Sequence, residues 1–281
     1  DEETGKDTIS LGKFDQIYLM CTNNKYDERP SISELMFIFY IITKVKSPKL
    51  LKDKEAQYIQ GLASFEDKYV SYNVDKAIHL YLYAAEHNFP KCFCLLGTIN
   101  FQGKYVPQDI NKAIYYYSLS AEKNITEAQF NLGVVYFALK DIEKAIHYFT
   151  LASDQNVSQA QFYLGSIYLE KNTFEDIYKA IHYYSLAANQ NHLPAQHNLG
   201  LMYIQGLYVS PNINKSIYYL HLAANQNDCD SQYILGCIYC DDKYGVKDID
   251  KGIYYYTLAA KQNDSGAQFS LALIYYYGEY V

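Results

Sequence analysis

Apolar residues recur along most of this chain with the spacing of an α-helix. In the stretch 128–136, Ala128, Leu132 and Tyr136 (or Val135) fall on one helical face. In the stretch 145–153 that follows, Ile146 and Phe149 form a second apolar stripe beside small residues. The pattern predicts a unit of two helices, helix A and then helix B, joined by a turn.

The same unit returns at a nearly constant interval. Helix A carries an L-G-x-x-Y phrase whose glycine, or its equivalent, stands at Gly61, Gly97, Gly133, Gly165, Gly200, Gly236 and Ala272. Successive steps are 36, 36, 32, 35, 36 and 36 residues. A period in this range is typical of a solenoid, in which each unit buries its apolar face against its neighbours. We therefore predict an all-α protein, a right-handed α-solenoid (α-α superhelix) of helix-turn-helix repeats with a short N-terminal helical segment.

Polar residues mark both ends of helix B. An Asp or Asn stands four residues before its first small residue, at Asn73, Asp109, Asp141, Asp176, Asn212 and Asp248. Such side chains accept hydrogen bonds from the first turn of a helix. An asparagine stands eleven residues after the same small residue, at Asn88, Asn124, Asn156, Asn191, Asn227 and Asn263. Since Asn tolerates the left-handed conformation that ends many helices, we predict a positive φ at most of these asparagines.

The glycine inside helix A also needs an explanation. Glycine in a helix interior costs about 1 kcal/mol relative to alanine. Its return in almost every unit predicts that another helix comes too close to leave room for a Cβ atom.

The combined phrase A-x-x-x-L-G-x-x-Y…G-x-x-V-x-x-D-x-x-K-A-x-x-Y-Y-x-x-A-A closely resembles the Sel-1-like repeat, a relative of the tetratricopeptide repeat. The resemblance covers residues 55–281, as six full repeats and the first helix of a seventh. It departs from the family in the Asn after helix B, and in Asn100, where the phrase has Tyr. The resemblance implies an α-solenoid adaptor that assembles complexes and has no chemistry of its own.

That open seventh repeat also leads to an expectation. Because the sequence gives it no helix B, the stretch from Ala267 to Tyr277 should expose apolar surface unless more chain or another molecule covers it.

Residues 1–50 do not fit the repeat, and we expect them to form an N-terminal helical segment. Within 15–46, the stretches 17–22 (I-Y-L-M-C-T) and 27–35 (D-E-R-P-S-I-S-E-L) resemble the end of a protein-kinase C-lobe. There, Arg29 would hold the place of an arginine that pairs with the activation segment. The same residues also fit a capping helix pair, with Ser31 or Ser33 as the cap. The Gly-rich loop, the H-R-D loop and the D-F-G metal site of kinases do not occur in the sequence.

Composition narrows the class of partner. The net charge of −7 argues against a nucleic-acid surface, which needs clustered Lys and Arg. The longest apolar run, 35–42, is about two helical turns and too short for a membrane span.

The six cysteines do not recur at one repeat position, so free thiols in a reducing, cytoplasmic compartment are expected. The 33 tyrosines mostly recur in register, which favours a packing role.

No residue pattern predicts catalysis, a cofactor or a metal site. Cys237 and Cys240 lie on a helix A, but His221 lies on the exposed face of a helix B, so four converging zinc ligands are not expected. His79, His147 and His182 share a repeat position with tyrosines, which indicates a surface position and not a general base. We predict that the chain is not an enzyme.

The positive prediction is a protein-binding surface. By analogy with the tetratricopeptide repeat, helix A lines the concave side of the solenoid. The predicted contact residues for a protein or peptide ligand are Phe130, Val134, Phe137, Phe162, Ser166, His197, Leu201 and Ile204. They can equally pack against the neighbouring helix A. Two alternative functions stay open: the substrate-recruiting C-terminal part of a kinase polypeptide, and a structural spacer with no dedicated ligand.

Overall fold

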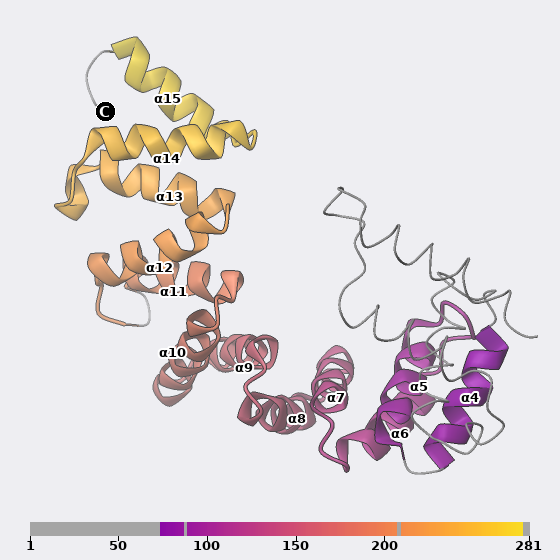
Figure 1. Ribbon diagram of the computed structural model, residues 1–281. Helices are drawn as coiled ribbons and strands as arrows, with labels where there is room; N and C mark the ends of the chain where they lie inside the picture. Colours follow the sequence, from indigo (N-terminus) through magenta and orange to yellow (C-terminus); the bar gives the residue numbers. More distant parts are fainter. Residues whose placement is uncertain (1–73, 87–88, 207–208, 278–281) are drawn as a thin grey trace, which may run out of the picture. The chain divides into compact units, whose positions relative to one another are not determined.

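The computed structural model describes residues 74–86, 89–206 and 209–277 (Figure 1). Every regular element in these ranges is a helix, which confirms the predicted all-α fold of helix-turn-helix repeats. The chain divides into two compact units, Asp1–Ile125 and Thr126–Val281. The expected N-terminal segment 1–50, its kinase-like stretch 15–46 and the expected start of the repeats at residue 55 lie outside the described residues.

The first unit contains three described helices. They are α4 (Val74–Glu86), α5 (Pro90–Gln102) and α6 (Ile110–Ala121). Helix α5 carries Gly97 and is a helix A, whereas α4 and α6 are the B helices of two consecutive repeats. Tyr81 of α4 and Leu96 and Ile99 of α5 lie in one buried core. Helix α5 packs against both of its neighbours.

The second unit continues the same alternation of A and B helices. Its α-helices are α7 (Thr126–Ala138), α8 (Ile142–Asp154), α9 (Ser158–Lys171), α10 (Phe174–Asn189), α11 (Leu193–Gln205), α12 (Ile213–Asn225), α13 (Cys229–Cys240), α14 (Ile249–Lys261) and α15 (Ser265–Tyr277). A short 3₁₀ turn, η3 (Asp242–Tyr244), lies in the loop between α13 and α14. The closest packing joins the two helices of each repeat, and each B helix also packs against the next A helix (Figure 1).

The glycine of helix A lies directly under a side chain of helix B. A Cβ atom on Gly133 would come within 2.5 Å of the Phe149 ring, and one on Gly165 within 2.6 Å of the Tyr184 ring. The same holds for Gly97, Gly200 and Gly236, which face Tyr117, Leu220 and Tyr256. The predicted lack of room is therefore confirmed, and the close neighbour is a fully or nearly fully buried side chain.

The cap of helix B is confirmed at four of the predicted positions. The side chains of Asp109, Asp141, Asn212 and Asp248 each accept a hydrogen bond from the backbone N–H three residues on. Asp176 is a wrong prediction, because α10 begins earlier and is capped by Thr173. Asp176 lies in the first turn, where its carboxylate accepts from Thr173 Oγ1 at 2.6 Å and its N–H donates back to that hydroxyl. Asn73 lies outside the described residues.

The left-handed asparagines are also confirmed. The φ angles are 59° at Asn124, 65° at Asn156, 59° at Asn191, 67° at Asn227 and 67° at Asn263. After α8, Asn156 N–H donates to Ser153 and Val157 N–H donates to Ala152, which closes the helix end. Asn88 lies outside the described residues.

A buried amide pair in four of the repeats was not predicted. Helix A contributes a buried glutamine that accepts a hydrogen bond from a glutamine just past helix B. The pairs are Gln129–Gln155 at 2.6 Å, Gln161–Gln190 at 2.7 Å, Gln196–Gln226 at 2.7 Å and Gln232–Gln262 at 2.8 Å. The sequence signal for these contacts was a glutamine after a small residue of helix A and a Q-N dipeptide past helix B. Together with the glycine contact, the pair sets how helix B lies on helix A.

Candidate functional site

The predicted contact residues come from three successive A helices of the second unit. Phe130, Val134 and Phe137 are in α7, Phe162 and Ser166 in α9, and His197, Leu201 and Ile204 in α11. All eight are half-buried. None is sealed in the core, and none extends freely into solvent.

The aromatic residues of α7 are held by rings of the following helices. The centroid of Phe130 lies 5.9 Å from that of Phe149 in α8 and 6.1 Å from that of Tyr163 in α9. Phe137 meets the same Tyr163 ring edge-on at 5.7 Å. These contacts leave the two rings little rotational freedom, so each presents a defined edge at the surface.

In α9, Phe162 lies between two aromatic residues. Its centroid is 5.6 Å from that of Tyr184 in α10 and 4.9 Å from that of His192, just before α11. Burial lowers the pKa of His192, so its ring is neutral at neutral pH and packs as an aromatic. Ser166 Oγ lies 3.1 Å from the Tyr184 hydroxyl and donates to the Phe162 carbonyl at 3.1 Å. Ser166 therefore offers no free hydroxyl hydrogen to a partner.

In α11, His197 is tied to the next repeat. Its Nδ1 lies 3.1 Å from Asp228 Oδ2 and 2.9 Å from Ser231 Oγ. Asp228 also caps α13 by accepting from the Ser231 N–H at 2.9 Å. Ile204 packs against the core formed by Leu220 and Leu235. In each of the three A helices, the predicted contact residues thus pack against the helices that follow and remain partly accessible to solvent.

The His197, Asp228 and Ser231 group does not have the geometry of a nucleophilic triad. Both oxygens contact the same imidazole nitrogen, whereas a triad needs the base and the orienting group on opposite nitrogens. Ser231 is also 0% exposed, so no substrate can reach its hydroxyl. The cluster is a structural contact between repeats.

The described residues contain no group of three or more His, Cys, Asp and Glu side chains that could hold a metal ion. Cys237 accepts a hydrogen bond from the Tyr256 hydroxyl, whereas His221 contacts the Tyr239 and Tyr255 hydroxyls. Across the same part of the chain, no helix is long and apolar enough to cross a membrane.

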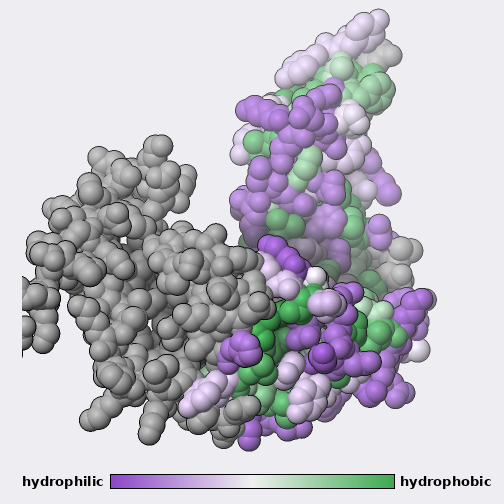
Figure 2. Space-filling model, turned by 90° about the vertical axis from the view of Figure 1, so that its right-hand side faces the viewer, coloured by the Kyte–Doolittle hydropathy of each residue, from purple (hydrophilic) through white to green (hydrophobic). Residues whose placement is uncertain are grey.

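Helix α15 exposes apolar surface, as expected. Phe269 is 65%, Tyr275 71% and Tyr276 81% exposed. In Figure 2 the α15 end, at the top, shows hydrophobic and weakly polar surface, while hydrophilic residues cover most of the neighbouring surface below it.

These features define a class of protein: a helical repeat protein in which A and B helices alternate through both units. The Sel1 repeat model matches the chain seven times, over residues 54–89, 94–125, 126–157, 158–192, 193–228, 229–264 and 265–281. The chain therefore belongs to the Sel1 repeat family. Proteins of this family are generally non-catalytic scaffolds for protein–protein interactions.

Solved structures share the fold. A protective antigen present in uropathogenic Escherichia coli strains, which displays an SLR fold, superimposes with a TM-score of 0.74 at 22% identity. That match covers 94% of this chain and 56% of the antigen, so the chain spans little more than half of its length. A Sel1 repeat protein from Oxalobacter formigenes gives a TM-score of 0.66 at 24% identity, covering 83% of this chain and 100% of that one. No curated protein is similar enough to count as a match.

Proposed function

We propose that this chain is an adaptor that binds a partner protein or peptide along the concave face of its A helices. The contact surface is formed by the eight residues of α7, α9 and α11 described above. The observation that supports it best is their common half-buried state: aromatic edges are accessible, yet their rings are held by the next repeat. Rigid, partly exposed aromatic anchors lose little conformational entropy on binding and are common hot spots.

The same contacts decide which variants test the proposal. Phe162 packs against Tyr184 and His192, so Phe162→Ala removes core contacts as well as a surface anchor. Phe162→Leu keeps most of the volume and removes the ring. The two variants, measured together with their melting temperatures, separate loss of binding from loss of fold.

The experiment starts from peptides selected from a random display library against the full chain. The affinity of the best peptide is then compared among wild type, Phe162→Ala, Phe162→Leu and Tyr218→Ala. Tyr218 is a matched control, because it is an aromatic residue 58% exposed on the B helix α12. We expect Phe162→Ala to weaken binding at least tenfold, the effect of a hot spot of about 2 kcal/mol, and Tyr218→Ala to leave it unchanged. Unchanged affinity in both Phe162 variants would reject this surface.

A second proposal is that the chain forms the substrate-recruiting part of a kinase polypeptide. It rests on the Arg29-Pro30-Ser31 phrase and its flanks, which lie outside the described residues. The coding sequence before Asp1 tests it directly: an upstream kinase domain would support it, and an unrelated sequence would reject it. A spacer with no dedicated ligand would instead yield no saturable peptide in the selection.

A further inference from the structure

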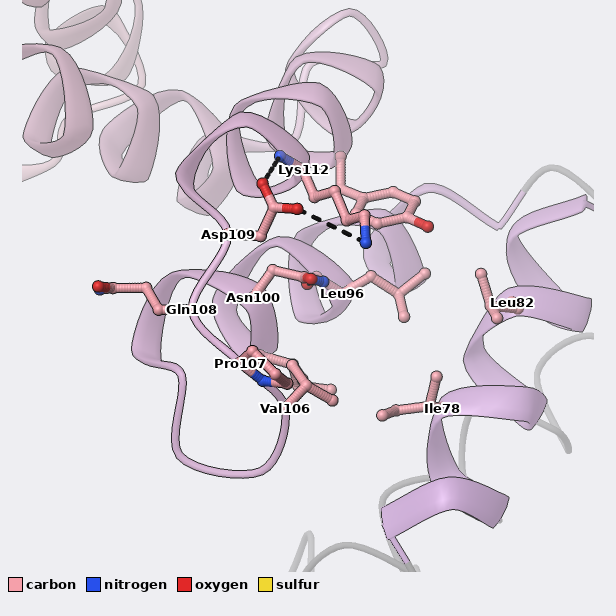
Figure 3. Close-up of a pocket in the computed structure, with 11 residues that line it drawn as sticks. Ile78, Leu82, Leu96, Asn100, Val106, Pro107, Gln108, Asp109 and Lys112 are labelled. Atoms are coloured by element: carbon pink, nitrogen blue, oxygen red, sulfur yellow. Dashed lines mark hydrogen bonds and ion pairs between the residues drawn. The ribbon is translucent and has the colours of Figure 1, made fainter.

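The first unit contains a cavity of about 340 Å³ between α4, α5 and the loop that leads to α6 (Figure 3). Ile78 and Leu82 of α4 point into it from one side, and Val106 and Pro107 of the loop lie opposite (Figure 3). Its size is at the lower end of the range of about 300–1,000 Å³ that is usual for ligand sites.

Other repeats show what normally fills this place. The tyrosine three residues after the helix A glycine stacks on a tyrosine of helix B, with centroids 5.6–6.0 Å apart and nearly parallel planes. The stacked pairs are Tyr136–Tyr148, Tyr168–Tyr183, Tyr203–Tyr219 and Tyr239–Tyr255. The ammonium groups of Lys144, Lys179, Lys215 and Lys251 lie 5.0–5.5 Å from the centroids of the helix A rings. The ring thus lies between a phenol and a cation, both favourable neighbours.

In the repeat of α5 and α6, this ring is replaced by Asn100 while its two neighbours remain. Lys112 and Tyr116 hold the positions of the lysine and the helix B tyrosine, and both line the cavity. The Asn100 amide does not fill the space, because its Nδ2 donates to the Leu96 carbonyl of its own helix at 2.7 Å.

One backbone hydrogen bond beside the missing ring is the same as in other repeats. Asp109 N–H donates to the Asn100 carbonyl at 3.0 Å. The same bond joins Asp141 to Tyr136 at 2.9 Å and Asp248 to Tyr239 at 2.8 Å. The loop therefore holds the place of a ring that the described residues around it do not supply.

Leu82 indicates which ring fits. The equivalent positions on other B helices are Ser118, Thr150, Ser185, His221 and Thr257. His221 Nε2 lies 3.1 Å from the hydroxyl of Tyr239, the ring of the following repeat. Leu82 offers no such partner, so a hydroxyl buried at this end of the cavity would lose its hydrogen bonds. A ring without a hydroxyl is favoured.

We propose that this cavity binds an aromatic side chain of a partner peptide, and phenylalanine in preference to tyrosine. The ring takes the place of the missing tyrosine, between Tyr116 and Lys112. This site lies in a different unit from the adaptor surface proposed above and does not depend on it.

The test uses the full chain with ¹³C-labelled Ile and Leu methyl groups. It is titrated with N-acetyl-phenylalaninamide, N-acetyl-tyrosinamide and N-acetyl-leucinamide. We expect the phenylalanine probe to shift the methyl signals of Ile78, Leu82 and Leu96 with a Kd on the order of millimolar, as is usual for a single ring. The tyrosine and leucine probes should bind several-fold more weakly.

Two variants follow from the internal comparison. Asn100→Tyr restores the ring, so it should weaken the phenylalanine probe at least tenfold and raise the melting temperature. Leu82→His introduces the residue found at His221, which contacts the Tyr239 hydroxyl, so it should reverse the preference between the phenylalanine and tyrosine probes. Phe162→Ala is the control. If the probe shifts the methyl signals of this variant as it does those of wild type, failure of the adaptor surface can be distinguished from failure of this site.

Three outcomes would overturn the proposal. The first is the absence of methyl shifts up to the solubility limit of the probe. The second is a wild-type cavity that binds no probe, together with an Asn100→Tyr variant that melts at a lower temperature than wild type. These two results would mean that another part of the chain already occupies the cavity. The third is self-association of the wild type, in sedimentation, that Asn100→Tyr abolishes, which would make a second copy of this chain the occupant.

Discussion

Helices α9 and α15 share the residues of the helix A phrase but have different surroundings. Both contain the tripeptide A-Q-F, at 160–162 and 267–269, followed by leucine, a small residue and a tyrosine at equal spacing. In both, the face toward the preceding repeat is buried: Ala160 and Ala267 are each 0% exposed. The face toward the following B helix differs, because Gln161 is buried whereas Gln268 is exposed.

The difference shows what a B helix adds to an A helix. In α9, the helix α10 places Tyr184 on Gly165, Gln190 on Gln161 and Tyr183 on Tyr168. In α15, the position of Gly165 is taken by Ala272, which is exposed, and the position of Tyr168 by Tyr275, which is 71% exposed. The same residue position is therefore a core site or a surface site according to the helix packed against it.

The glycine position gives the largest expected effect. A helix normally gains stability when Gly becomes Ala, by about 1 kcal/mol. Gly165→Ala should instead lower the free energy of unfolding by about 3 kcal/mol, since the new Cβ would meet the buried Tyr184 ring and overpack the core. Urea melts followed by circular dichroism measure the change.

The control is the reverse substitution in the uncovered helix. Ala272→Gly should destabilise by at most about 1 kcal/mol, because only helix propensity changes at an exposed site. A more stable Gly165→Ala protein would show that the Tyr184 ring can move aside.

The buried amide gives the next largest effect. Gln161→Ala removes a hydrogen bond to Gln190 and leaves a cavity, so it should lower the free energy of unfolding by about 2 kcal/mol. Gln268→Ala at the equivalent exposed site should stay within about 0.5 kcal/mol of wild type. Equal losses at the two positions would mean that the amide pair contributes nothing beyond the local helix.

The smallest effect concerns the end of the B helix that covers α9. Asn191 has a φ of 59°, a conformation that a β-branched side chain disfavours. Asn191→Val should therefore destabilise by about 1 kcal/mol, whereas Asn191→Gly should be neutral or slightly stabilising. Superimposable thermal melts of the wild type and the valine variant would rule out strain at this cap.

Much of the fold could be predicted because its signals are local. The period of the L-G-x-x-Y phrase, the Asp and Asn caps and the left-handed asparagines each depend on residues a few positions apart. The one cap that failed, Asp176, failed for a local reason too: Thr173 offers an earlier cap, and α10 therefore starts before the repeat register predicts. Prediction of the site was less complete, because partial burial of Phe162 or His197 depends on the next repeat.

The sequence by itself determined that this protein is a series of paired helices, since apolar spacing and capping act within one or two turns. Only the tertiary structure decided which equivalent positions differ in environment. Gln161 and Gln268 hold the same repeat position, yet Gln161 is buried and Gln268 is exposed. Asn100 and Tyr168 also hold one repeat position, yet Asn100 borders a cavity whereas the Tyr168 ring is stacked on Tyr183. The physical reason is that burial in a solenoid is a property of the contact between neighbouring helices and not of one helix.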